Sequence, residues 1–208
     1  EKRKIDLEKG VLKNSLPHAT PPITKPASTY PAAMATAMMS ASLKSYYDHF
    51  HNLAYTDALT GLNNKAAFEM ARGVIESELK MHRAAFTIIV MDVNNLKTIN
   101  DSIGHEKGDL LLKHVALCMR DTFVGFPLYR IGGDEFCTIL NGTTDAGDLI
   151  AKLQADCARR SDEDVAVFQC AYQIAAGSAD YDRECDSSFD DVFNRADKAM
   201  YENKRFLK

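Results

Sequence analysis

The hydrophobic positions of residues 64–206 follow two different periods. Apolar residues spaced by three and four predict amphipathic helices, and short continuous apolar runs rich in β-branched residues predict buried strands. The helical period covers 66–82, 108–123, 144–160 and 189–206, and the apolar runs cover 85–93, 128–131, 135–140 and 165–177.

Between residues 85 and 177 these elements follow the order strand, helix, strand, strand, helix, strand. Gly132 and Gly133 separate the two middle strands and predict a hairpin, and their lack of Cβ atoms lets the backbone come close to a ligand. The order is typical of a ferredoxin-like or palm fold, an α+β class in which helices cover one face of an antiparallel sheet. The helices over 66–82 and 189–206 are additions at its ends.

The first 54 residues have a different character. Five of the six prolines lie between residues 17 and 31, so we expect residues 1–32 to be an extended linker or the end of an upstream domain. Residues 33–54 predict a connecting or signalling helix ahead of a globular domain over 55–208. An apolar stripe runs along this helix at Met39, Leu43, Tyr46, Tyr47, Phe50 and Leu53. Packing on its own domain and pairing with a partner helix in a parallel dimer both fit so short a stripe.

Composition and charge exclude several classes of protein. The 208 residues have a formal charge of −4, yet residues 1–54 carry seven basic and four acidic side chains and the remainder 18 and 25. The domain is therefore acidic, which argues against binding to nucleic acid polymers in general. The longest uncharged window, residues 26–43, contains seven Pro, Ser or Thr residues and does not predict a membrane segment.

Cysteine and histidine spacing does not predict a disulfide framework or a zinc site. The five cysteines include no C-x-x-C pair, and the six histidines have no metal-binding spacing. Free cysteines of this kind are typical of core residues in a reducing compartment. We therefore expect a cytoplasmic domain, within a longer protein that can carry a sensor domain and a membrane anchor upstream.

The strand predicted over 85–93 has a carboxylate at its end. Asp92 closes an apolar run, where a negative charge is costly unless a cation meets it, so a metal ligand explains it better than a solvated loop residue. In the predicted sheet this strand lies beside the hairpin, which brings Asp92 close to Asp134 and Glu135. Three carboxylates repel one another without a divalent cation. Hard oxygen ligands suit Mg²⁺ or Mn²⁺, and a pair of such ions is common in phosphoryl chemistry.

Residues after this strand suit a purine nucleotide. Residues 93–97 predict a turn into a short helix whose N–H groups can hold phosphates, with Lys97 as a point charge. Asn100 and Asp109 lie on either side of a turn bounded by glycines. An Asp can accept two parallel hydrogen bonds from guanine N1–H and N2–H₂, which adenine cannot offer. Leaving that carboxylate unpaired costs at least about 1–3 kcal/mol, a preference for GTP over ATP of about ten- to a hundredfold or more.

Four motifs, in this order, resemble those of a known family. They are DALTGLNNK from Asp57, DVNNLKTINDSIGHEKGD from Asp92, RIGGDEF from Arg130 and ADKAMYENK from Ala196. Their order and spacing are similar to the GGDEF diguanylate cyclase family over about residues 53–208. The resemblance implies a nucleotide cyclase-like GGDEF fold. It also implies the condensation of two GTP molecules into cyclic di-GMP, with release of two pyrophosphates.

The resemblance also implies roles for individual residues. Two Mg²⁺ or Mn²⁺ ions per active site would be held by Asp92, the Val93 carbonyl, Asp134 and Glu135, and one of the last two would be the catalytic base. The implied substrate-binding residues are Asn95, Leu96, Lys97 and Lys204 at the phosphates, Asn100 and Asp109 at the guanine, and Gly132 and Gly133 in the hairpin. Each domain holds one GTP, so turnover needs a second GGDEF protomer in a homodimer.

The chain departs from the family pattern at a few positions. Asn94 stands where Asp is frequent and Lys65 where Arg is usual, and neither is an implied ligand. Lys208 replaces a terminal arginine, which keeps the charge but loses the bidentate fork. Phe123 and Phe126 occupy the positions of an inhibitory product-binding R-x-x-D motif, so we expect no feedback inhibition through that site.

Three hypotheses remain open. The residues alone support a two-metal purine nucleotide site on a palm-like sheet, and the resemblance adds the reaction of a diguanylate cyclase output domain. A catalytically silent GGDEF module that acts as a GTP or cyclic di-GMP receptor is the alternative, although the signature from Gly132 to Phe136 is intact. An adenylyl-cyclase-like or polymerase-palm enzyme is disfavoured by Asp109 and by the lack of a basic template groove.

Overall fold

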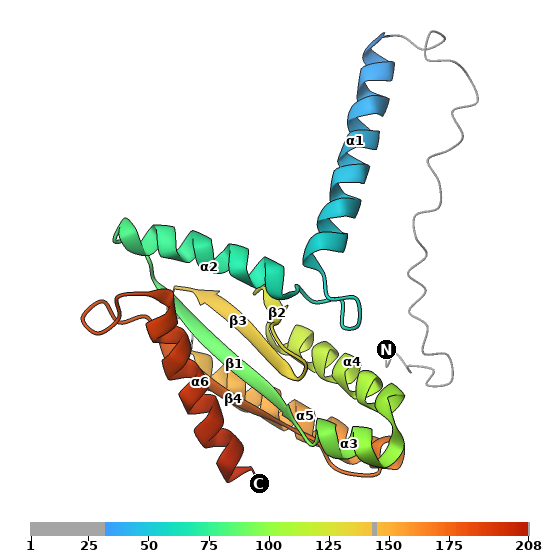
Figure 1. Cartoon of the computed structure of the whole chain (residues 1–208), viewed down its shortest axis with the longest axis vertical. Helices are drawn as coiled ribbons and strands as arrows, with labels where there is room; N and C mark the ends of the chain where they lie inside the picture. The colour runs from blue at the N-terminus through green and yellow to red at the C-terminus, as the bar shows by residue number, and fades with distance from the viewer. Residues whose placement is uncertain (1–31, 143–144, 208) are drawn as a thin grey trace. The chain divides into compact units, whose positions relative to one another are not determined.

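The computed structural model describes residues 32–142 and 145–207, so the expected linker falls almost wholly outside the described residues. The chain divides into two units, Glu1–Phe50 and His51–Lys208. The first described element is the helix α1 (Ala32–Tyr55), where a connecting helix was expected (Figure 1). Its apolar side chains from Met34 to Leu53 are exposed. No helix in the described ranges is both long and apolar enough to cross a membrane.

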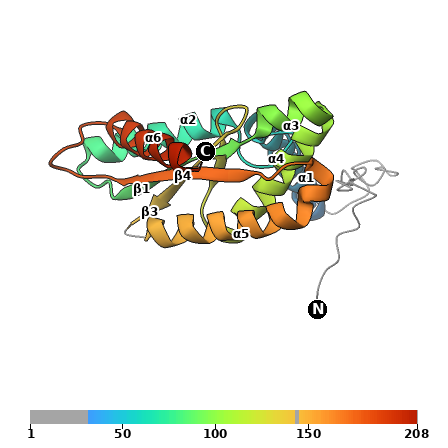
Figure 2. The same ribbon diagram turned by 90° about the horizontal axis from the view of Figure 1, so that it is seen from below.

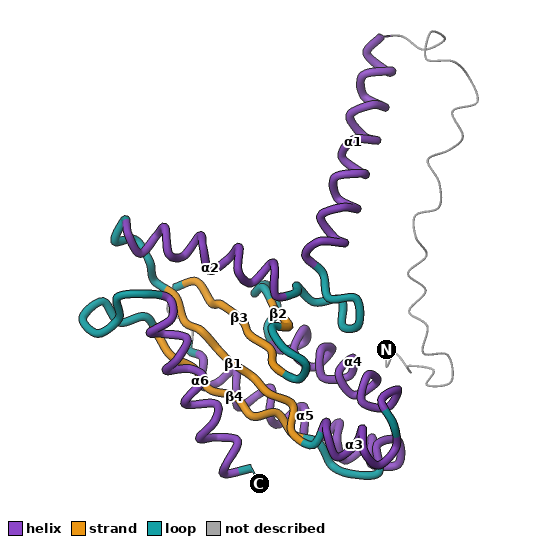
Figure 3. The backbone as a smooth tube through the Cα atoms, in the orientation of Figure 1, coloured by secondary structure: helices purple, strands orange, loops and turns teal. Residues whose placement is uncertain are grey.

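The second unit is built on a four-stranded antiparallel sheet with the order β2-β3-β1-β4 (Figure 3). The strands are β1 (Phe86–Asn94), β2 (Leu128–Arg130), β3 (Glu135–Asn141) and β4 (Gln173–Asp180). The helices are α2 (Lys65–Lys80), α3 (Leu96–Ile103), α4 (His105–Thr122), α5 (Ala146–Phe168) and α6 (Phe189–Phe206). The α+β class, the ferredoxin-like order and the pairing of the first strand with the hairpin are confirmed.

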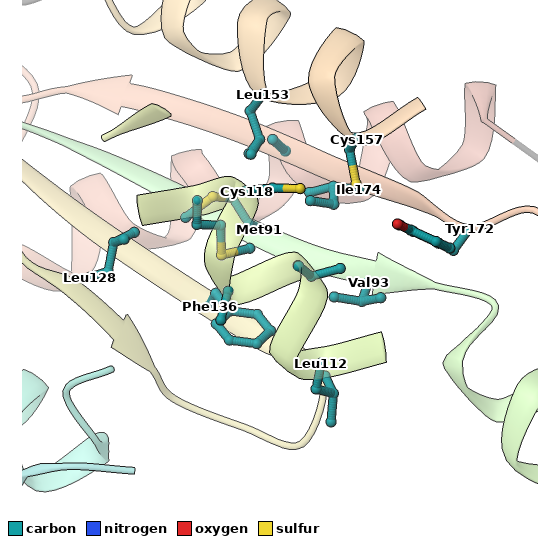
Figure 4. Packing of buried hydrophobic residues seen from close by; sticks show 14 of the residues in the cluster. Met91, Val93, Leu112, Cys118, Leu128, Phe136, Leu153, Cys157, Tyr172 and Ile174 are labelled. Carbon is teal, nitrogen blue, oxygen red and sulfur yellow. The ribbon is translucent and has the colours of Figure 1, made fainter. Parts of the chain in front are cut away.

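Helices cover both faces of this sheet (Figure 2). The helices α4 and α5 lie on one face, and the additional helices α2 and α6 lie on the other. Met91 and Val93 of β1 pack into the first layer (Figure 4), whereas Ile88 and Val90 pack into the second. All nine residues of β1 are buried as a result.

The sequence pattern was wrong about where α5 ends. The prediction placed a helix over 144–160 and a strand over 165–177, but α5 continues to Phe168 and ends at Gln169, whose φ is 58°. Ser161 and Phe168 lie two helical turns apart and are both buried. Burial of these two side chains on one helical face outweighs the β propensity of the valines between them, because local propensity is weaker than tertiary packing.

A glycine allows α6 to lie directly against the edge strand β4. A Cβ atom built on Gly177 would lie 2.0 Å from the Met200 nitrogen and 2.6 Å from the Ala196 carbonyl oxygen. Both are backbone atoms, so no side-chain movement can relieve the contact. Any larger residue at this position must push α6 away from the sheet.

Gly177→Ala should therefore destabilise the fold by at least about 1–3 kcal/mol, as measured by urea unfolding. Gly73→Ala is the matched control, because a Cβ at this exposed position in α2 meets nothing within 4 Å. We expect Gly73→Ala to stabilise the chain by about 0.5–1 kcal/mol. Equal unfolding free energies for Gly177→Ala and the wild type would contradict the close approach of α6 to β4.

Candidate active site

The buried strand β1 carries a carboxylate two residues before its end, and this carboxylate meets a lysine. Asp92 pairs with Glu135 on β3 and with Ala175 on β4. By the alternation of strand side chains it shares the face of Val90, which is covered by α2 and α6. Lys204, in the last turn of α6, donates from Nζ to Asp92 Oδ1 at 2.6 Å. This ion pair neutralises a charge that is costly to bury alone.

The signature hairpin is tied to the end of β1 through the main chain. The Val93 N–H donates to the Asp134 carbonyl at 3.1 Å, and the N–H groups of Ile131 and Gly132 donate to the Glu135 carbonyl at 3.0 and 3.2 Å. A Cβ atom on Gly132 would lie 2.5 Å from Glu135 Oε2. Glycine at this position therefore leaves room for the Glu135 carboxylate over the turn.

The expected grouping of three carboxylates is present only in part. Asp92 and Glu135 are cross-strand partners. The Cβ atoms of residues paired in this way lie about 4.5–5.5 Å apart. Asp134 is half-buried and Glu135 exposed. Within the described ranges, no three Asp, Glu, His or Cys side chains gather closely enough to hold a metal ion. Like charges repel, so these donors can converge only around a cation. As hard oxygen ligands, they suit Mg²⁺ or Mn²⁺.

The segment after β1 starts the short helix α3 without a side-chain cap. Asn95, the N-cap residue, has a φ of 69°, a left-handed conformation that Asn tolerates better than most residues. The Asn95 side chain does not cap the helix, and its Nδ2 donates to the Ala171 carbonyl at 2.9 Å. Leu96 is buried and Lys97 is exposed in the following turn. The first N–H groups of α3 therefore lack a side-chain acceptor and can hold an anion.

Two asparagines near this helix have polar atoms without hydrogen-bond partners. In the described residues, four buried side-chain atoms lack a partner: Nδ2 and Oδ1 of Asn94, Oδ1 of Asn100 and Oγ1 of Thr122. Such atoms are rare and cost about 1–3 kcal/mol each. Three of the four belong to the β1–α3 segment, which suits this segment to a polar ligand or to ordered water.

Asn100 lies against the start of α4. A Cβ atom on Gly108 would lie only 1.9 Å from Asn100 Oδ1, so glycine is needed for the two helices to meet here. Asp109 follows Gly108 directly and is exposed. The two residues expected to read guanine are therefore neighbours through the α3–α4 contact.

Arg130 joins the loop after α1 to the signature hairpin through Asp57 and Gly133, and we call this set of hydrogen bonds the arginine bracket. Arg130 donates from Nη1 to both carboxylate oxygens of Asp57, at 3.1 and 3.3 Å. Its Nε and Nη2 donate to the carbonyl of the exposed Gly133, at 3.2 and 2.7 Å. Sequence reasoning gave Arg130 and Asp57 no role, since their only signal was membership of two separate motifs.

The family of the chain follows from this fold and from comparison with known proteins. An antiparallel sheet whose Gly132–Phe136 hairpin lies opposite a buried carboxylate defines a GGDEF-type domain. The family described as "Diguanylate cyclase, GGDEF domain" matches residues 54–206. The chain belongs to the GGDEF diguanylate cyclase family.

Two curated relatives carry the name diguanylate cyclase. DgcS of Shewanella oneidensis is 28% identical over 159 residues, which are 76% of this chain and 52% of DgcS. DgcP of Pseudomonas aeruginosa is 31% identical over 179 residues, which are 80% of this chain and 25% of DgcP. The chain thus spans about half the length of DgcS and a quarter of that of DgcP.

Solved structures agree on the fold. The coiled coil and GGDEF domain of DgcB from Caulobacter crescentus, in complex with c-di-GMP, superposes with a TM-score of 0.70 at 24% identity and covers 83% of this chain and 92% of that one. The GGDEF domain of DgcB by itself gives 0.63 at 26% identity, covering 73% and 91%. The active GGEEF domain of a diguanylate cyclase from Vibrio cholerae gives 0.54 at 26% identity, covering 64% and 90%.

The charge of Asp57 makes the bracket depend on pH. Partial burial by itself raises the pKa of Asp57, but hydrogen bonds from Thr60 and Arg130 outweigh it and leave the pKa below its ordinary value. The contribution of Asp57 to stability should therefore be present at neutral pH and disappear as the pH falls below about 4 and the carboxylate is protonated.

We expect Asp57→Asn to lower the unfolding free energy by about 1–3 kcal/mol at pH 7, since it removes the negative charge and replaces one of the two acceptor oxygens with an amide that donates. The gap between variant and wild type should narrow as urea unfolding is repeated at pH 5, 4 and 3. A gap of constant size over this range would show that the carboxylate charge does not hold the bracket.

Proposed function

We propose that this chain is a catalytically competent diguanylate cyclase domain, the output domain of a signalling protein, which condenses two GTP into cyclic di-GMP and two pyrophosphates. One observation carries the proposal: Asp92 and Glu135 face each other across the β1–β3 ladder, within an unbroken signature and with Lys204 at contact distance. Family membership limits the class of reaction, and DgcS and DgcP bear the name of the enzyme.

The GTP would lie across the start of α3, between the hairpin and α6. Asn100 and Asp109 would hold the guanine edge, and the partnerless Oδ1 of Asn100 supports this role. The phosphates would be held by the amides of Asn95 and Leu96 and by the side chains of Lys97 and Lys204. The exposed Gly133 and its neighbour Gly132 would let the nucleotide lie close to the backbone.

Carboxylates near the end of β1 and in the hairpin would perform the chemistry. Asp92, the Val93 carbonyl, Asp134 and Glu135 would hold two Mg²⁺ or Mn²⁺ ions, which neutralise phosphate charge when bound. Asp134 or Glu135 would take the proton of the ribose 3′-hydroxyl. The 3′-oxygen would then bond to the α-phosphorus of the other GTP, and the bond to pyrophosphate would break. Positioning and charge neutralisation supply the catalysis.

A second copy of the chain would complete the reaction, because each protomer supplies one GTP. The stripe on α1 supports a parallel pairing of two such helices, since Met39 and Leu43 are 73% and 72% exposed. An upstream sensor would act through this helix.

Incubation of the chain with Mg²⁺ and GTP, followed by chromatography of the products, tests the proposal. We expect cyclic di-GMP from the wild type, and a loss of about 10²-fold or more in Asp134→Ala and Glu135→Ala, because each removes a group that holds a cation or moves a proton. Asp162→Ala, on the exposed side of α5, is the control and should keep full activity.

A monomer has no partner active site, so the assay also uses a chain with a parallel dimeric coiled coil fused ahead of α1. The fusion should raise activity if the wild type is monomeric. A dimer that binds GTP or cyclic di-GMP yet makes no product would contradict the proposed enzyme activity and support a receptor role instead.

Asp109→Asn should reduce the affinity for GTP by about ten- to a hundredfold, since the amide repels one of the two guanine donors. Its affinity for ATP should change little. Asp101→Asn removes an exposed carboxylate from the neighbouring helix α3 and serves as the control. Equal losses for GTP and ATP in a titration followed by calorimetry would argue against guanine recognition by Asp109.

Product inhibition should not arise at the position of the family's inhibitory motif. Phe123 is buried and Phe126 packs against the same core, so neither position offers a charged group to a phosphate. We expect the initial rate of synthesis to stay constant when micromolar cyclic di-GMP is added. A strong decrease of the initial rate under these conditions would contradict this expectation.

A further inference from the structure

We propose that Lys204 competes with the divalent cation for Asp92, and that nucleotide phosphates relieve the competition by binding Lys204. The inference rests on the proposed function, since it takes Asp92 as a cation ligand and Lys204 as a phosphate contact. It adds an order to the binding events. The affinity for the cation is low before the nucleotide binds and high once the nucleotide is bound.

The ion pair is short, and its carboxylate is buried while its lysine is partly exposed. Lys204 Nζ lies 2.6 Å from Asp92 Oδ1, and the two side chains are 26% and 7% exposed. A carboxylate so deeply buried gains more from a nearby cation than an exposed one does. The ammonium thus occupies an oxygen of the group that would bind the metal ion.

The backbone that carries Lys204 is fixed in place. Asn203 Oδ1 accepts from the Ala176 N–H on β4 at 3.0 Å and from Gln154 Nε2 on α5 at 2.9 Å. The same Nε2 also donates to the Ile174 carbonyl at 3.0 Å. These bonds use the open edge of β4 and hold the last turn of α6 against the sheet. Movement of Lys204 is therefore confined to its flexible stem.

Competition follows from the charges. A divalent cation bound to Asp92 would lie close to the Lys204 ammonium, because that ammonium is only 2.6 Å from Asp92 Oδ1. Two positive charges so close together repel strongly in a partly buried site. Phosphate oxygens offer the ammonium another acceptor, and its departure leaves the Asp92 carboxylate to the cation. By linkage, cation and nucleotide then raise each other's affinity by the same factor.

Titration of the full chain with Mn²⁺ in the absence of nucleotide tests the competition, with free Mn²⁺ followed by electron paramagnetic resonance. Lys204→Met keeps the stem and removes the charge, and should raise Mn²⁺ affinity roughly 5- to 150-fold. Lys198→Met removes an exposed lysine from the same helix and should leave the affinity unchanged. In an Asp92→Asn background, Lys204→Met should no longer have an effect, because the competition acts through that carboxylate.

Asn203→Ala guards against a Lys204→Met variant that fails to fold. It loosens the last turn of α6 while keeping the lysine, and should raise Mn²⁺ affinity by a smaller factor. The release of Asp92 from Lys204 by phosphate is tested with a non-hydrolysable GTP analogue, in EDTA so that no divalent cation is bound. The ¹³C carboxyl signal of Asp92 should move towards its position in Lys204→Met.

Equal Mn²⁺ affinities for the wild type, Lys204→Met and Asn203→Ala would overturn the inference, even if cyclic di-GMP is still formed. An effect of Lys204→Met that persists in the Asp92→Asn background would also overturn it. An Asp92 signal unmoved by the analogue would overturn relief by the nucleotide. Failure of the proposed function looks different: the Mn²⁺ effects would remain, but no product would form.

Discussion

The central strand β1 is buried along its whole length, and it carries a carboxylate into that buried environment two residues before its end. Burial on both faces requires helices on both faces, which α4 and α5 provide on one side and α2 and α6 on the other. The charge of Asp92 requires a cation, which Lys204 provides from α6. The same strand therefore organises the core and fixes the place where charged chemistry can occur.

The helix α6 links these two roles. It lies so close to β4 that only glycine fits at position 177, and Asn203 bonds to the edge of the same strand. Packing against the sheet thus sets the position of Lys204 relative to Asp92. On the other side of the sheet end, Arg130 ties the hairpin to the loop after α1. These hydrogen bonds fix the hairpin to the chain segment that enters the domain.

Local patterns predicted most of the fold. The spacing of apolar residues predicted both ends of α6 correctly, and the order of elements predicted that β1 lies beside the hairpin. The end of α5 was missed, because the valines before Phe168 look like a strand, whereas the burial of Ser161 and Phe168 on one helical face keeps this stretch in the helix. The contacts that hold the site were beyond sequence patterns: Arg130 and Asp57 are 73 positions apart, and Lys204 and Asp92 are 112 apart.

A crystal structure of the chain with Mg²⁺ and a non-hydrolysable GTP analogue tests the central claim most directly. The account predicts the triphosphate between the start of α3 and Lys204, metal ions at Asp92, and the guanine edge at Asn100 and Asp109. A nucleotide bound elsewhere would contradict it. So would one that leaves Lys204 on Asp92 and Oδ1 of Asn100 without a hydrogen-bond partner.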